Sequence, residues 1–149
     1  MKIRDIMDPS PDIIRTSDTF EHIIKILNEV KYHVVFVVDK EEKLVGIVTE
    51  GDIIKVLVPK YVTVDESLIS VMDVNYFERK CKECKDLTIN EIMSKTTFLV
   101  REEDPIIKAV ALMVVNKIHT IPVVRDNKVV GIVSRLTLIK HITKVLTEH

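Results

Sequence analysis

The sequence predicts an α+β fold of two β-α-β-β-α units that pack through their sheets with pseudo-two-fold symmetry. The first observation behind this prediction is an internal repeat, because residues 3–56 and 89–141 carry the same pattern. The second is that apolar runs typical of strands alternate with apolar residues at helical spacing in each copy. The third is that the open face of one such sheet is too apolar to face water, so two units should cover each other.

The two copies align with one insertion. At an offset of 86 positions Met7 falls on Met93 and His33 falls on His119. One extra residue in the charged turn 39–43 changes the offset to 85, which places Gly46 on Gly131. An extra residue is well tolerated in a surface turn, so the chain is an internal duplication of one small domain.

The expected elements follow the same order in both copies. In the first copy the strands are 12–15, 34–38 and 44–48 and the helices are 20–30 and 52–57; in the second copy the strands are 98–101, 121–124 and 129–133 and the helices are 106–114 and 137–146. The apolar run 34–38 is typical of a buried central strand. Residues 58–88 have no counterpart after the second copy. We therefore predict a first domain over 1–57, a helical bridge over 58–88 and a second domain over 89–149.

Local signals support these boundaries. Asp18 and Glu21 have the spacing of a capping box at the start of the first helix. Gly46 and Gly131 occupy equivalent strand positions, which indicates a backbone requirement in the hairpin rather than a phosphate-binding loop.

Composition excludes several classes of protein. Apolar residues make up 46% of the chain, enough for a core, but aromatic residues only 5%, so the core must consist of Ile, Val and Leu. The net charge of −1 provides no general attraction for nucleic acid or anionic membrane. The apolar runs are far shorter than the roughly 20 residues of a spanning helix. Two cysteines and a first segment without a signal-peptide pattern favour a cytoplasmic protein that contacts neither nucleic acid nor membrane.

The sequence offers no residues for catalysis. Its acidic residues are spread over predicted turns, and its three glycines form no phosphate-binding loop. Cys81 and Cys84 form a single CxxC pair, whereas a structural zinc site needs four ligands, so we interpret them as structural. We therefore expect neither an enzyme nor a metal site, and no cofactor.

The sharpest local motif is the run from Thr49 to Asp52 ahead of the helix 52–57. This spacing is a capping box, in which the side chains satisfy the first N–H groups of the helix without any ligand. The same helix start could also receive a phosphate, and the carboxylate could accept hydrogen bonds from a vicinal diol. Both interpretations are compatible, because a cap can pre-form a binding site.

At this point the chain resembles a known family, the tandem pair of CBS domains also called a Bateman module. The resemblance rests on four motifs in order: Asp5 to Met7, its repeat Glu91 to Met93, the strand His119 to Val124, and the segment Gly46 to Asp52. It covers almost the whole chain except the bridge 58–88.

The resemblance implies a regulatory module that binds AMP, ADP, ATP or S-adenosylmethionine in clefts between the two units. Asp52 would bind the two ribose hydroxyls, and Thr49 a ribose or phosphate oxygen. The equivalent histidines would face the cleft, although a structural role for each stays open. The adenine would lie between strands, in contact with residues for which plain core is the alternative: Ile14, His33, Val34, Val35, His119, Thr120 and Ile121.

The second copy departs from the family pattern. Thr137 stands where the ribose-binding aspartate is expected, and a hydroxyl brings no charge. Ser134 would be the equivalent of Thr49, and Arg135 could compensate by binding phosphate or could be an ordinary surface residue. We therefore expect two unequal clefts, of which the second is weak, empty or selective for phosphate.

The resemblance also implies partners. Such pairs commonly dimerise through their helices, so we expect a homodimer, and a pair without an enzyme domain would act on an unidentified effector protein. The alternative function is a ligand-free dimerisation or scaffold protein that works through protein–protein contacts.

Overall fold

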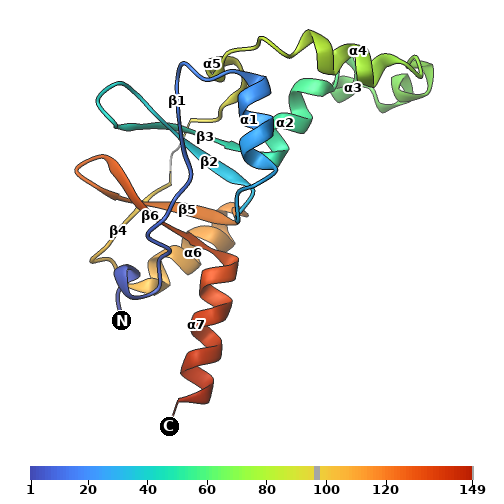
Figure 1. Cartoon of the computed structure of the whole chain (residues 1–149). Coiled ribbons are helices and arrows are strands. Elements are labelled where there is room, and N and C mark those ends of the chain that lie inside the picture. Colours follow the sequence, from blue (N-terminus) through green and yellow to red (C-terminus); the bar gives the residue numbers. More distant parts are fainter. Residues whose placement is uncertain (96–97, 149) are drawn as a thin grey trace.

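The computed structural model describes residues 1–95 and 98–148, which form two three-stranded sheets (Figure 1). In each sheet the first strand is parallel to the central strand and the third is antiparallel to it, as the repeat predicts. The strands are β1 (Ile13–Arg15), β2 (Val34–Val38), β3 (Leu44–Thr49), β4 (Val100–Arg101), β5 (Thr120–Arg125) and β6 (Lys128–Ser134).

Four helices complete the two units, and they lie on the outer faces of the two sheets (Figure 1). They are α1 (Phe20–Leu27), α2 (Glu50–Leu57), α6 (Ile106–Asn116) and α7 (Arg135–Thr147). The fold class and the order β-α-β-β-α are therefore confirmed.

The start of α1 differs from the prediction. Thr19 is the N-cap, and its Oγ1 accepts a hydrogen bond from the N–H of His22 at 3.4 Å. The capping box predicted at Asp18 and Glu21 is wrong, because the Asp18 carboxylate instead accepts the N–H of Arg15 at 2.9 Å and contacts the His22 ring at 2.7 Å. The carboxylate thus fastens the turn before the helix to β1.

The bridge between the units is helical, as expected. It contains α3 (Lys60–Val64), a 3₁₀ helix η2 (Glu66–Val71) and α4 (Tyr76–Glu83), and it projects from the first unit as an arm (Figure 1). Cys84 ends α4 and is buried in the core of the first unit, whereas Cys81 is partly exposed. This placement is consistent with a packing role for Cys84.

Each unit has its own apolar core, and a third cluster joins them. Val35 and Ile23 lie in the first core, and Ile121 lies in the second. Between the two sheets Phe36 packs in one cluster with Ile132. The units therefore pack through their sheets, and the buried β2 faces a core on one side and the other unit on the other.

Short segments are exchanged between the units. The 3₁₀ helix η1 (Ile3–Asp5) precedes the first unit in sequence, but Ile3 is fully buried in the core of the second. Conversely, α5 (Ile89–Ile92) precedes the second unit but lies in the core of the first. The backbone confirms the exchange, because Ile47 pairs with Ser94 through two hydrogen bonds of 2.9 Å. Each unit is thus completed by residues from outside its own sequence repeat.

The exchange explains the equivalent glycines. A Cβ at Gly46 would lie 2.5 Å from the Sδ of Met93 and 3.0 Å from the carbonyl oxygen of Ser94. A Cβ at Gly131 would meet Met7 at 2.7 Å and the carbonyl oxygen of Asp8 at 3.0 Å. Neither glycine has a positive φ, so the backbone requirement is close approach of the exchanged segment.

Candidate functional site

A cleft of about 610 Å³ lies between the two units, at the N-terminal end of α2. Both units contribute to it, since β2, β3 and α2 supply one wall and the segment ahead of β5 supplies the other. Its lining includes Tyr32, His33, Val34, Ile47, Thr49, Asp52, Lys55, Ser94, Lys117, Ile118, His119 and Thr120. We call it the first cleft. Six of the residues that the sequence analysis proposed for ligand binding meet there.

Thr49 and Asp52 form the capping box at the start of α2. The Asp52 Oδ2 accepts hydrogen bonds from the N–H of Thr49 at 2.9 Å and from its hydroxyl at 3.1 Å, and the N–H of Asp52 donates to Thr49 Oγ1 at 3.3 Å. The cap is therefore present, and it holds the Asp52 carboxylate in the wall of the first cleft with 7% of the residue exposed.

Ser94 is a cleft residue that the sequence analysis missed. Its hydroxyl donates a hydrogen bond of 2.7 Å to Oδ1 of Asp52. Ser94 belongs to the exchanged segment that pairs with Ile47, so the second unit's leading segment positions the carboxylate of the first. No local motif marks this contact, because the two residues are 42 positions apart.

The first cleft also carries basic groups. His33 and His119 are exposed side chains that both line it, one from each unit, which excludes a buried structural role for either. Lys55 on α2 and Lys117 after α6 are exposed on its rim. These groups can attract an anion to a site whose one buried carboxylate is already held by hydrogen bonds.

The remaining proposed adenine contacts have different positions. Val34 and Thr120 line the first cleft. The side chains of Ile14, Val35 and Ile121 are at most 2% exposed and lie in the two cores. They support the walls of the cleft from behind.

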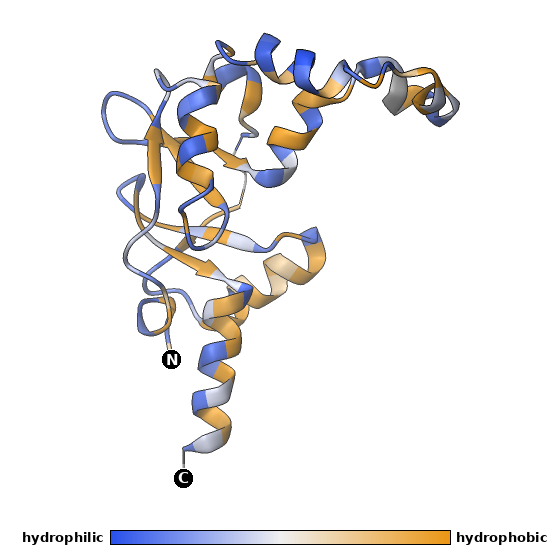
Figure 2. Cartoon of the chain, turned by 45° about the vertical axis from the view of Figure 1, so that its right-hand side comes forward, coloured by the Kyte–Doolittle hydropathy of each residue, from blue (hydrophilic) through white to orange (hydrophobic). Residues whose placement is uncertain are grey.

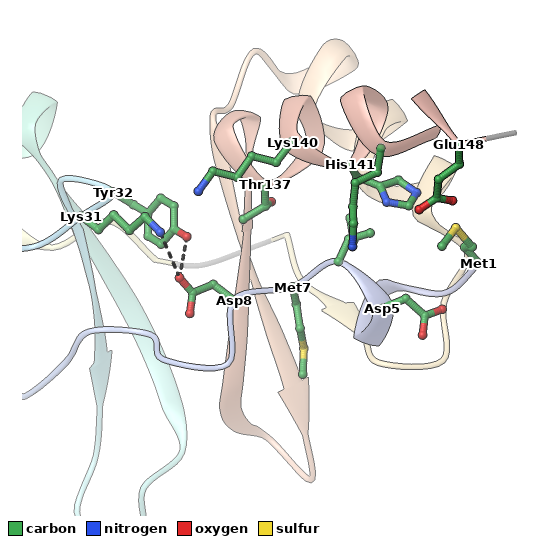
Figure 3. Close-up of a pocket in the computed structure, with 12 residues that line it drawn as sticks. Met1, Asp5, Met7, Asp8, Lys31, Tyr32, Thr137, Lys140, His141 and Glu148 are labelled. Carbon is green, nitrogen blue, oxygen red and sulfur yellow. Dashed lines mark hydrogen bonds and ion pairs between the residues drawn. The ribbon is translucent and has the colours of Figure 1, made fainter. Parts of the chain in front are cut away.

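A second cleft of about 360 Å³ occupies the pseudo-equivalent position in the other unit (Figure 3). Thr137, the equivalent of Asp52, lines it together with Asp8, Lys31, Tyr32 and Lys140. The predicted asymmetry is therefore visible in the side chains that the two clefts present.

The start of α7 keeps the cap of α2 in neutral form. The N–H of Thr137 donates to Ser134 Oγ at 3.2 Å, and the Thr137 hydroxyl accepts from the N–H of Ser134 at 2.9 Å and donates to its carbonyl at 2.9 Å. Both residues are buried. The hydroxyl is thus fully used within the cap.

Asp8 supplies the carboxylate of the second cleft. It accepts a hydrogen bond of 2.6 Å from the hydroxyl of Tyr32, and Lys31 Nζ lies 3.9 Å away (Figure 3). The Tyr32 hydroxyl lowers the pKa of Asp8, partly opposed by burial. Burial and then the hydrogen bond to Asp8 raise the pKa of Tyr32. The pair is therefore a carboxylate held by a neutral phenol.

Arg135 lies outside both clefts. It lines a separate pocket of about 310 Å³ between α6 and α7, together with Lys117 and His119. The predicted compensation by Arg135 in the second cleft therefore has no support in the geometry. Among residues 1–95 and 98–148, no group of three His, Cys, Asp or Glu side chains could hold a metal ion. In the same residues, no helix has the length and apolar character needed to cross a membrane.

These features define a class of protein: two exchanged β-α-β-β-α units with a ligand-sized cleft at their junction. The family follows from comparison with known proteins. The model of the CBS domain matches residues 3–59 and again 89–144, so the chain belongs to the CBS domain family and contains a tandem pair.

A similar relative is an uncharacterised protein of Methanocaldococcus jannaschii, 28% identical over 152 residues that cover 94% of this chain and 90% of the relative. Other curated relatives are longer, and the chain spans 22% of one and 58% of another.

Solved structures show the same fold. The CBS domain pair of protein MJ0100, in complex with 5′-methylthioadenosine and S-adenosyl-L-methionine, has a TM-score of 0.73 and 25% identity, with 97% of this chain and 98% of that chain covered. CBSX2 in complex with AMP has the same TM-score and coverages at 22% identity, which shows the fold alone.

Proposed function

We propose that this chain is a regulatory module that binds an adenosine-containing ligand, such as AMP, ADP, ATP or S-adenosylmethionine, in the first cleft. The observation that carries this proposal is the carboxylate of Asp52 at the junction of the units, positioned by Thr49 from one unit and Ser94 from the other. The complexes of MJ0100 support the ligand class, since its CBS domain pair binds two adenosine compounds.

The chemistry assigns roles within the cleft. Asp52 would accept hydrogen bonds from the vicinal hydroxyls of the ribose, and the Ser94 hydroxyl could rotate to make room for them. His33, His119, Lys55 and Lys117 would face the phosphates or other polar groups of the ligand. A ligand that touches both units would favour one arrangement of the units, which a separate effector protein could detect.

Isothermal titration with AMP, ATP and S-adenosylmethionine tests the proposal. Asp52→Asn keeps the shape of the cap but removes the charge, and loss of a charge-assisted hydrogen bond of about 1.5–3 kcal/mol predicts binding weaker by roughly 10- to 100-fold. Asp86→Ala is a suitable control, because it removes an exposed carboxylate outside the cleft. If no adenosine compound binds at millimolar concentration, the proposal is wrong.

A second candidate function is dimerisation without a ligand. It is favoured by exposed apolar side chains on α6 and α7, which form a continuous apolar stripe down α7 (Figure 2) and include Ile107, Val114, Ile139, Ile142 and Leu146. Such a surface is typical of an interface, and a homodimer through these helices is our proposal for it. It is also compatible with ligand binding.

Sedimentation analysis tests the dimer. Ile139→Lys should convert a dimer to a monomer, because it places a charge in the centre of the stripe. Val74→Lys, at an exposed position in the bridge, should leave the mass unchanged. A stable dimer whose melting temperature ignores every nucleotide would favour the scaffold function over the ligand sensor.

A further inference from the structure

The acid and the hydroxyl are transposed between the two clefts. In the first cleft the carboxylate is on the helix, at Asp52, and the hydroxyl is on the exchanged segment, at Ser94. In the second cleft the hydroxyl is on the helix, at Thr137, and the carboxylate is on the exchanged segment, at Asp8. The offset of the repeat makes these positions equivalent in pairs. The second cleft has therefore kept a carboxylate but has moved it to the opposite wall.

The new position brings the carboxylate to a partner that the first cleft lacks. Tyr32 donates its hydroxyl to Asp8 Oδ2 at 2.6 Å, whereas the equivalent of Tyr32 beside the first cleft is Ile118, which has no donor. The other oxygen of Asp8 accepts the N–H of Ser10 at 2.9 Å. Both carboxylate oxygens are therefore occupied, one by a small backbone group and the other by a bulky ring.

We propose that the Asp8–Tyr32 pair closes the second cleft to adenosine ligands, so that each chain takes one such ligand, in the first cleft. The inference rests on the proposed function and adds its stoichiometry and the residues that set it. A ribose diol in the second cleft would have to displace Tyr32 from Asp8, because the Thr137 hydroxyl is already used within its cap. In the first cleft it has only to displace the small hydroxyl of Ser94.

The charges of the second cleft support closure. The amine of Lys31 is 3.9 Å from Asp8, and Lys140 extends toward the pair (Figure 3) and lowers the pKa of Asp8. Asp12 lies close enough for the charge of Asp8 to raise its pKa. The nearby lysines are thus matched by acidic groups of the protein, which leaves less attraction for the phosphates of a ligand.

Titration calorimetry with AMP on the full chain measures the stoichiometry. We expect one AMP per chain in the natural protein. The triple variant Asp8→Ser, Tyr32→Ile, Thr137→Asp copies the equivalent residues of the first cleft, and we expect it to bind two. Addition of Asp52→Ala to this variant should return the value to one. Two AMP per natural chain, or one per folded triple variant, would overturn the inference.

A ligand-independent measurement separates this inference from the proposed function. Failure of the natural protein to bind any adenosine compound would contradict the function, but the pair can still be detected by titrating Tyr32. In a Tyr61→Phe, Tyr76→Phe background Tyr32 is the one tyrosine of the chain. Its absorbance should show ionisation well above the usual pKa of about 10, and Asp8→Ser should restore that value. Ordinary ionisation in the presence of Asp8 would overturn the closed pair.

Discussion

Among single residues, Asp8 and Tyr32 make a prediction about stability and pH. The folded protein lowers the pKa of Asp8 from 3.8, so the pair stabilises the folded state above that pH and this contribution is lost as the pH falls below it. The raised pKa of Tyr32 preserves the donor up to its ordinary value of 10.0. Because the Asp8 side chain is 22% exposed, we expect Tyr32→Phe to cost about 1 kcal/mol at pH 7. Urea unfolding at pH 7 and pH 3 measures the difference.

Tyr61→Phe is the matched control, because Tyr61 is half exposed and lies in the bridge. Its effect on the free energy of unfolding should be small and independent of pH. An equal cost of Tyr32→Phe at pH 7 and pH 3 would show that the ring contributes by packing and not through the carboxylate.

Single residues also show how far the sequence could predict the site. The pair Thr49 and Asp52 is visible as a local motif, and the structure places both in the first cleft. Ser94 and Asp8 are not visible, because their contacts depend on segments that cross from one unit to the other. Arg135 was assigned to the second cleft from its neighbour in sequence, but it lies on the far side of α7.

Among the elements, the close contact between β3 and the exchanged segment predicts a specific cost for Gly46→Ala. The added methyl would displace Met93 and crowd the carbonyl of Ser94, so we expect a loss of about 1–3 kcal/mol from overpacking. Gly51→Ala is the control. A Cβ there meets Thr49 Oγ1 at an ordinary 3.5 Å inside α2, so it should be neutral or stabilise by up to about 1 kcal/mol. Chemical denaturation compares the two.

The opposite order of stability would mean that Met93 and Ser94 can move away from β3 without cost. The element order itself was predictable because strands and helices follow from apolar periodicity in a short window. The exchange was not, since the apolar residues of η1 and α5 have the same pattern whichever core they enter. The N-cap of α1 was missed for a similar reason, because Asp18 and Thr19 are both good caps and the strand β1 decides between them.

In the whole molecule, the exchanged segments predict that the two units unfold together. Ile3 is in the core of the second unit and Ile89 in the core of the first, and each is fully buried. Loss of either side chain therefore weakens a core together with the segment that ties the units to each other. The shared cluster of Phe36 and Ile132 adds a direct contact between the sheets.

Calorimetry should accordingly show one transition for the natural protein, and Ile3→Ala and Ile89→Ala should each shift it as a single peak. A buried Ile→Ala change costs about 2–5 kcal/mol, which corresponds to a decrease in melting temperature of roughly 5–15 °C for a chain of this size. Val74→Ala, at a position 91% exposed in the bridge, should have little effect. Two separate peaks, with each variant lowering only one of them, would show that the units are independent domains despite the exchange. A single peak would mean that a ligand in the first cleft stabilises the second unit as well as the first, because neither core can open alone.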